Sequence, residues 1–249
     1  MFPKLVCLIA LAAIVWSNAS VAAAQTPTFT ISGTVTDSTG HGLADVTMIL
    51  LSDVTGTQIT FTDQNGNYVF NYAGSVSHTV RITPSKAGYA FEPLWTAFVS
   101  SVGLTGNQTA TFTGAPSSTP SSQQLPILMT QVNSLSALAL DSVTMVKEPF
   151  GVMGFNNFST DQRTRVLLFA ANVELSAGET ASVITAQAED SVGQIFPLTV
   201  EHFGAVPNFA WLKQVVVKLP DAIANSGEVR ISLKLRGTAG NKVIVKVKP

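Results

Sequence analysis

The chain is nearly devoid of cysteine. Its one cysteine, Cys7, lies in the apolar segment at the N-terminus. Disulfides, zinc–thiolate sites, iron–sulfur clusters and cysteine catalysis are therefore excluded from everything that follows this segment. A protein exported without disulfides depends on its hydrophobic core and its strand pairing for stability.

Charge is also scarce. Charged residues make up 12% of the chain, and the formal net charge is −1 at pH 7. Such a balance gives no field that would attract nucleic acid or an anionic membrane, so we expect no nucleic-acid partner. Hydrophobic residues make up 46% of the 249 residues, which argues against disorder and allows two domains with sizeable cores.

Catalytic motifs are missing as well. The chain has three histidines and no H-E-x-x-H, G-x-S-x-G, Walker or G-x-G-x-x-G string. The neighbours Glu189 and Asp190, and the neighbours Glu201 and His202, fall in expected strands, where adjacent side chains point to opposite faces and make poor acid–base couples. We therefore predict a non-catalytic protein without a cofactor, although residues distant in sequence could still assemble a site.

The N-terminal segment has the layout of a secretory signal. Lys4 precedes the apolar run LVCLIALAAIVW (5–16), and Ala22 and Ala24 form an A-x-A pattern before Gln25. The run is shorter than the roughly 20 residues that a membrane span needs. We predict a signal peptide over 1–24, cleaved between Ala24 and Gln25, and a secreted, periplasmic or cell-surface bacterial protein with no membrane span after cleavage. An uncleaved anchor is the alternative.

A change of composition divides the remaining chain. The stretch GAPSSTPSSQQLP (114–126) is rich in proline and serine and has no charge, as expected of a solvated, fairly stiff linker. We predict one domain over 25–114, a linker over 115–126 and a second domain over 127–249.

Both domains show the pattern of short β-strands. Apolar and polar residues alternate in TFTISGTVTD (28–37) and in EVRISLKLRG (228–237), which predicts strands with one buried and one solvated face. Turn residues separate the strands and no window has a sustained helical period, so we predict an all-β chain of two β-sandwiches. A helical turn that ends at Gly227 is expected within 219–227. The other expected strands are 46–53, 57–63, 67–74, 78–85, 95–101, 107–114, 138–146, 163–175, 181–190, 195–203, 211–220 and 241–249.

The N-terminal domain resembles a known family. The stretch ISGTVTDSTGHGLADVTMIL (31–50), followed by TDQNGNYVF (62–70), is similar to the carboxypeptidase regulatory-like and Cna-B-like modules. The matching positions are Gly33, Val35, Asp37, Gly40, Leu43, Val46, Thr62, Asp63, Gly66, Tyr68 and Phe70. The resemblance implies a transthyretin-like sandwich, also grouped with carbohydrate-binding-like folds, that serves as a spacer, stalk or accessory domain in exported proteins. The second domain resembles, less specifically, Ig-like segments of exported bacterial proteins, on the stretches WLKQVVVKLP and EVRISLKLRG.

Two interpretations compete for DQNGN (63–67). Asn65-Gly66 is a strong signal for a two-residue hairpin turn. The oxygen-bearing side chains of Asp63, Asn65 and Asn67 are spaced as in the first half of a calcium loop, but the closing bidentate glutamate is missing. We favour the turn and keep calcium as the alternative.

Aromatic residues are the remaining candidates for binding. Trp95, with Tyr89 and Phe91 nearby, could form an exposed platform for a sugar ring or could pack in the core. Trp211 is expected in a core or at a domain interface. The loop 147–165 could bind a ligand or serve as a packed crossover. We predict a structural or adhesive protein whose partners are envelope proteins or extracellular polysaccharide, with carbohydrate binding by the N-terminal domain as the alternative.

Overall fold

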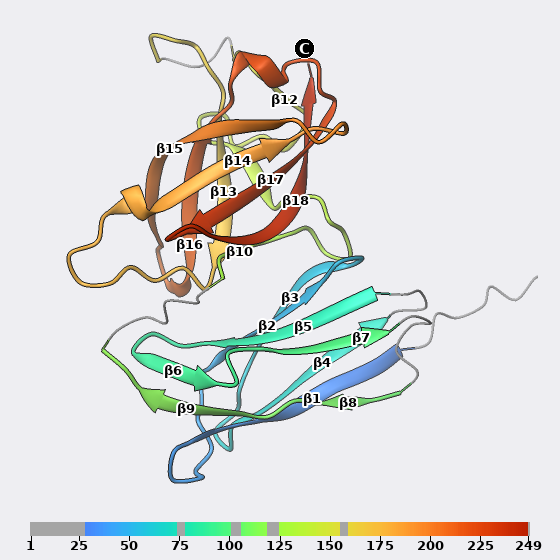
Figure 1. The fold of residues 1–249 in the computed structure, drawn as a ribbon, viewed down its shortest axis with the longest axis vertical. Coiled ribbons are helices and arrows are strands. Elements are labelled where there is room, and N and C mark those ends of the chain that lie inside the picture. Colours follow the sequence, from blue (N-terminus) through green and yellow to red (C-terminus); the bar gives the residue numbers. More distant parts are fainter. Residues whose placement is uncertain (1–27, 74–77, 101–105, 119–124, 155–158, 249) are drawn as a thin grey trace, which may run out of the picture.

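The chain folds into two units of β-sheet that lie one against the other (Figure 1). The computed structural model describes residues 28–73, 78–100, 106–118, 125–154 and 159–248. Strands dominate this part of the chain, which confirms the predicted all-β class, and none of its helical segments is long and apolar enough to cross a membrane. The predicted signal peptide, with Ala24 and Gln25, lies outside the described residues.

The first unit is a sandwich of two sheets. One sheet has the order β4-β1-β9-β6, with β8 beside β1, and the other has the order β3-β2-β5-β7. The last strand, β9, runs on to Pro116, so the start of the expected linker belongs to the sheet. The strands are β1 (Thr28–Asp37), β2 (Thr47–Ser52), β3 (Gly56–Phe61), β4 (Asn67–Ala73), β5 (His78–Ser85), β6 (Tyr89–Glu92), β7 (Thr96–Ser100), β8 (Gln108–Thr109) and β9 (Phe112–Pro116).

The core of the first unit follows from alternation along the strands. Ile31 and Val35 of β1 face Met48 and Leu50 of β2 and Ile82 of β5, and all five side chains are buried. Residues between them along each strand point to the outer faces, because successive side chains of a strand alternate. The outer face of the β3-β2-β5-β7 sheet is the one turned toward the second unit (Figure 1).

The segment 63–67 is a turn, but the predicted hairpin is wrong. Strand β3 pairs with β2 and strand β4 pairs with β1, so the turn carries the chain from one sheet to the other. Gly66 has a φ of +78°, and its carbonyl accepts a 2.8 Å hydrogen bond from the Val35 N–H. Asn65-Gly66 thus lies in a tight turn, as predicted, whereas strand pairing is decided by which partner buries each apolar face.

The second unit is a sandwich built from one continuous sheet. Its order is β10-β13-β16-β15-β14-β17-β18-β12, with β11 beside β13. Residues 195–198 of β15 pair with β14, residues 199–206 pair with β16, and the register shifts between Val200 and His202. A bulge at this point bends the strand and lets it belong to both layers. The strands are β10 (Ile127–Leu128), β11 (Ala139–Asp141), β12 (Phe150–Gly151), β13 (Arg165–Ala171), β14 (Ile184–Glu189), β15 (Ile195–Val206), β16 (Phe209–Lys218), β17 (Glu228–Leu235) and β18 (Thr238–Lys248).

One of the expected strands in the second unit is mostly a turn. The segment 138–146 keeps only β11 in strand form, because the Asp141 carboxylate accepts hydrogen bonds from the N–H groups of Val143 and Thr144 at 2.9 and 2.8 Å. The helical turn expected within 219–227 is confirmed as a 3-10 turn, η2 (Asp221–Ile223). A second 3-10 turn, η1 (Ala181–Val183), precedes β14.

A small apolar core, which we call the seam, joins the two units. Thr57 of β3 and Thr130 of the second unit exchange two hydrogen bonds of 2.9 Å, each from a backbone N–H to the other residue's Oγ1. Trp211 meets the ring of Phe61 edge-on at 6.1 Å, as expected of an interface tryptophan. The buried residues of the seam are Ile49, Ile127, Met129 and Ala171, and Ile59, Phe169, Trp211 and Leu212 pack against them.

Candidate functional site

The three aromatic residues predicted for binding line a single cavity. Tyr89 and Phe91 lie on β6, and their rings stack with centroids 6.3 Å apart. Phe91 is buried in the first core with 8% of its surface exposed, and Tyr89 is half-buried. Trp95, between β6 and β7, is 45% exposed, so the alternative that it packs in the core is wrong.

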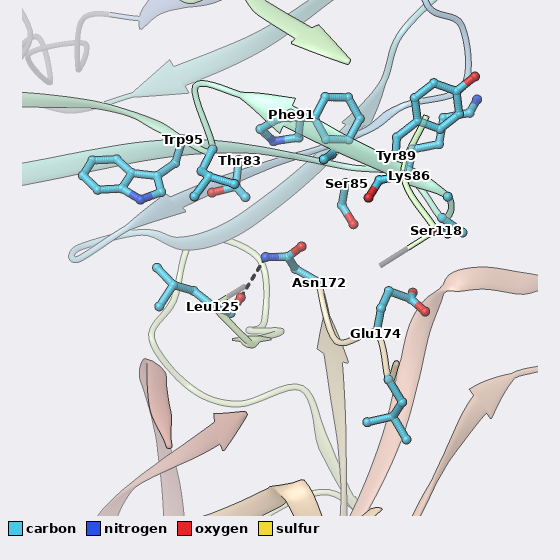
Figure 2. Close-up of a pocket in the computed structure, with 17 residues that line it drawn as sticks. Thr83, Ser85, Lys86, Tyr89, Phe91, Trp95, Ser118, Leu125, Asn172 and Glu174 are labelled. Carbon is cyan, nitrogen blue, oxygen red and sulfur yellow. Dashed lines mark hydrogen bonds between the residues drawn. The ribbon is translucent and has the colours of Figure 1, made fainter. Parts of the chain in front are cut away.

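This cavity, of about 310 Å³, lies between the two units (Figure 2). Its polar groups mostly support its walls. The Lys86 Nζ donates to the Ala44 carbonyl at 2.6 Å, and the Asn172 Nδ2 donates to the Leu125 carbonyl at 2.9 Å. Glu174 forms an ion pair with Lys213. These three polar groups are thus engaged within the protein, and Tyr89, Phe91 and Trp95 add aromatic surface to the cavity.

Trp95 also borders a second and larger hollow, of about 600 Å³, which we call the groove. The floor of the groove is the outer face of β2, β5 and β7, where Leu51, Arg81 and Ala97 are direct cross-strand neighbours. Its residues from the first unit are Leu51, Ser52, Asp53, Gly56, Thr79, Arg81, Trp95 and Ala97, and those from the second are Thr130, Leu135, Arg230, Asn241, Lys242 and Ile244.

Arg81 is the unusual residue of the groove. Val80 and Ile82 on either side of it point into the first core, so Arg81 points outward into the groove. Its Cζ lies 5.9 Å from the centroid of the Trp95 ring, within the range of a cation–π contact. Its Nε is buried without a hydrogen-bond partner, and burial lowers the pKa of the guanidinium from its usual value. No carboxylate in the described part of the chain forms an ion pair with it.

The residues predicted as alternative calcium ligands are used by the turn itself. The Asp63 Oδ1 accepts the N–H groups of Asn65 and Asn67 at 2.9 and 2.8 Å, and its Oδ2 accepts the Asn67 Nδ2 at 3.2 Å. The hydrogen bonds from Asn67 lower the pKa of Asp63. Across the described ranges, no three residues of the types His, Cys, Asp and Glu are grouped so that they could hold a metal ion.

The described part of the loop 147–165 is tied down by ion pairs. The Arg165 guanidinium donates to Asp161 at 2.6 Å and to Glu201 at 2.8 Å, and Lys218 lies within 3.4 Å of Asp161. The hydrogen bond from Arg165 is the main reason that the pKa of Asp161 lies below its ordinary value. Val152 is buried in the second core. This geometry agrees with a packed crossover; residues 155–158 lie outside the described part.

The adjacent pairs considered for acid–base chemistry have other partners. Glu189 pairs with Lys242 at 2.5 Å, and Asp190 caps the turn before β15 by accepting the N–H of Gln194 at 2.8 Å. Glu201 belongs to the ion pairs of Arg165, and the His202 ring contacts the Gln214 amide at 3.3 Å. Different partners thus hold the two members of each pair.

Comparison with known proteins adds little. No protein-family model matches the chain, and no protein with a curated description matches it in sequence. The chain is similar to the major pilin subunit BcpA of Bacillus cereus (8% identity, TM-score 0.30, 89% of this chain and 69% of the pilin). It is also similar to a streptococcal ancillary pilin (12% identity, TM-score 0.29, 74% and 61%) and to 3-chlorocatechol 1,2-dioxygenase from Rhodococcus opacus (16% identity, TM-score 0.29, 36% and 60%). The alignments span less than two thirds of the last two proteins, and at these TM-scores the likeness carries no conclusion about function.

Three cationic residues of the groove were missed at the sequence level: Arg81, Arg230 and Lys242. The signal for Arg81 was an arginine in the middle of the alternating strand HTVRITPS (78–85), on the side opposite to Val80 and Ile82. That position predicts a solvated arginine on an outer face. Its partial burial follows only from the second unit, which covers this face.

Proposed function

We propose that the chain is an exported, non-catalytic structural or adhesive protein of the cell envelope or extracellular space. The observation that carries this proposal is the seam. Eight apolar side chains and the paired threonines Thr57 and Thr130 hold the two units in one orientation. Two sandwiches packed in this way make a stiff building block, as a stalk or spacer requires, whereas a flexible linker would let them move independently.

The N-terminal motif supports a role as a carboxypeptidase regulatory-like or Cna-B-like module of transthyretin type. A side chain at Gly33 would overlap the Ala110 carbonyl, and one at Gly66 would overlap the Val35 carbonyl. The Tyr68 hydroxyl donates to the Ala110 carbonyl at 2.7 Å. The motif residues thus serve close backbone approach and core packing, which are structural tasks.

A binding assay with envelope material tests the proposal. Labelled mature chain, residues 25–249, is mixed with washed bacterial envelopes and sedimented, with and without prior removal of surface protein or polysaccharide. We expect the chain to sediment with the envelopes and the treatment that releases it to reveal the partner. A chain that stays in the supernatant with every envelope preparation contradicts the proposal.

Carbohydrate binding is the second candidate, and the exposure of Trp95 favours it. A flat aromatic ring that is half open to solvent can cover the apolar face of a sugar, and Tyr89 and Phe91 extend the aromatic wall of the adjoining cavity. Because both hollows use residues of both units, the test requires the intact mature chain. Retention on a polysaccharide column that Trp95→Ala abolishes without unfolding supports this function; no retention on a broad panel of neutral and acidic polysaccharides argues against it.

A further inference from the structure

The groove contains a cation that the protein itself does not neutralise. Arg81 is partly buried, its Nε lacks a partner, and no carboxylate of the described residues pairs with it. A guanidinium with one buried, unpartnered N–H is less favourable than one whose N–H groups are all paired, and a bound anion would compensate for part of this cost. Since arginines of this kind are usually paired, the arrangement indicates a site that an external anion fills.

The rest of the groove has the same sign of charge. Arg230 and Lys242 line the wall from the second unit, and Asp53 is the one acidic residue among the lining side chains. The Asp53 carboxylate is engaged with the backbone, because its Oδ1 accepts a 3.0 Å hydrogen bond from the Thr79 N–H. Lys242 forms an ion pair with Glu189, so Arg81 and Arg230 are the two cations lining the groove for which no ion pair is formed with a described residue.

Three uncharged polar side chains of the groove, those of Ser52, Thr130 and Asn241, are already engaged within the protein. The Thr130 Oγ1 accepts the Thr57 N–H, and the Asn241 amide exchanges hydrogen bonds of 2.7 and 2.9 Å with the backbone of Leu128. The Ser52 Oγ accepts two backbone N–H groups and contacts the Tyr72 hydroxyl. A neutral ligand would therefore find few hydrogen-bond partners, whereas an anionic ligand finds two guanidinium groups.

We infer that the groove binds an acidic carbohydrate, with the carboxylate of a uronic acid on Arg81 and its sugar ring against Trp95. This inference rests on the carbohydrate-binding function proposed above and names its ligand class. The planar fork of a guanidinium matches a carboxylate with two parallel hydrogen bonds. Arg81 and Trp95 are in contact, so a single sugar unit reaches both. Leu51, Ala97 and Ile244 give the groove apolar walls that suit the C–H surface of a sugar ring.

An acidic peptide fits the groove less well. An extended peptide gains affinity from main-chain hydrogen bonds to an open sheet edge. The floor of the groove is a sheet face, and β5 is paired on both sides, with β2 and with β7. The backbone of β5, at the centre of the floor, therefore offers no free partners to a peptide, and over this strand side chains have to recognise the ligand.

Calorimetry on the intact mature chain tests the inference. The probes are tetramers of galacturonate, mannuronate and glucuronate, the matching neutral tetramers of galactose, mannose and glucose, and a hexaglutamate peptide. We expect at least one uronate to bind about tenfold or more tightly than its neutral counterpart, because charge-assisted hydrogen bonds are lost in the neutral sugar. Arg81→Gln should remove this preference, and Arg81→Lys, which keeps the charge but not the fork, should restore it only in part.

The control is Lys248→Gln, which removes one positive charge from β18 outside the groove and should leave binding unchanged. Equal binding of acidic and neutral tetramers overturns the inference while carbohydrate binding stands. No binding of any sugar overturns both. Binding of hexaglutamate as tight as that of the uronates overturns the assignment to a carbohydrate. Loss of uronate binding in Lys248→Gln as large as in Arg81→Gln would show a net-charge effect rather than a site.

Discussion

Replacing Arg81 by methionine should make the unliganded protein more stable. The substitution removes a guanidinium whose Nε is buried without a partner and which no carboxylate among the described residues neutralises. Methionine is unbranched and of similar length, so it can follow the path of the arginine stem across the floor of the groove. Binding residues that carry a cost in the free protein are a known source of such stabilising substitutions.

The expected change in the free energy of unfolding follows from two opposing contributions. Removing an unsatisfied buried N–H group recovers about 1–3 kcal/mol. The cation–π contact with Trp95, 5.9 Å from the Arg81 Cζ, is lost and is worth about 0.5–1 kcal/mol, of which a sulfur–aromatic contact restores a part. The free energy of unfolding should therefore rise by about 1 kcal/mol, which corresponds to about 2–4 °C in Tm for a chain of this size.

Urea denaturation and calorimetry of the wild type and of Arg81→Met measure this change on residues 25–249. Lys248→Met is the matched control, because this exposed lysine lies outside the groove and its substitution should change stability by less than about 0.5 kcal/mol. A loss of stability of about 1 kcal/mol or more in Arg81→Met would refute the reasoning. The guanidinium would then belong to the folded framework, and its lack of a partner would not mark a binding site.

Three further predictions concern the seam, pH and the turn. Thr130→Val removes the acceptor of the buried Thr57 N–H and should lower the free energy of unfolding by about 1–3 kcal/mol in urea denaturation; a change within error would show that water replaces the threonine. Hydrogen bonds from Arg236 hold the pKa of Glu179 at about 2, below its ordinary value of 4.5. The ionised form of Glu179 thus stabilises the fold above pH 4.5, and this stabilisation is lost as the pH falls toward 2. Wild type and Glu179→Gln should therefore differ in stability at neutral pH and converge near pH 2. A difference that stays constant with pH would contradict the pairing of Glu179 with Arg236. Asp63→Ala should lower the Tm, whereas calcium should leave the wild-type Tm unchanged, and a calcium-dependent rise would restore the metal interpretation.

Local pattern was enough to predict most of the strands. The alternation in 28–37 predicted β1 with its bounds, and its inward-facing Ile31 and Val35 are fully buried. The same pattern predicted β17 to within two residues at one end. In both strands one face lies on a core and the other faces outward, so the sequence period of two records the environment of each residue.

Strand pairing and long-range contacts could not be predicted from the local sequence pattern. Asn65-Gly66 has the chemistry of a tight turn, but β3 and β4 on either side find their partners in different sheets. The change of layer along β15 depends on a bulge near Glu201, and no turn residue in the sequence predicts this bulge. Such features are set by which faces bury each other, and this is a property of the whole chain.

The site was predicted in part. Tyr89, Phe91 and Trp95 do share one cavity, and their nearness in sequence was the signal. Arg81 was missed, because an arginine on an outer strand face is ordinarily solvated. Its burial requires the second unit to cover this face, and no residue within 78–85 carries that information.

Small-angle X-ray scattering of the mature chain tests most directly whether the two units form one stiff block. Gly56 has a φ of +77°, and a side chain there would overlap Thr130 and the Ser134 carbonyl at the seam, whereas Gly193 has a φ of +85° with open space around it. The account predicts that one fixed arrangement of the units fits the wild type and Gly193→Ala, while Gly56→Ala requires a range of arrangements or a shifted one. A wild-type profile that fits only a broad range of orientations would contradict the account.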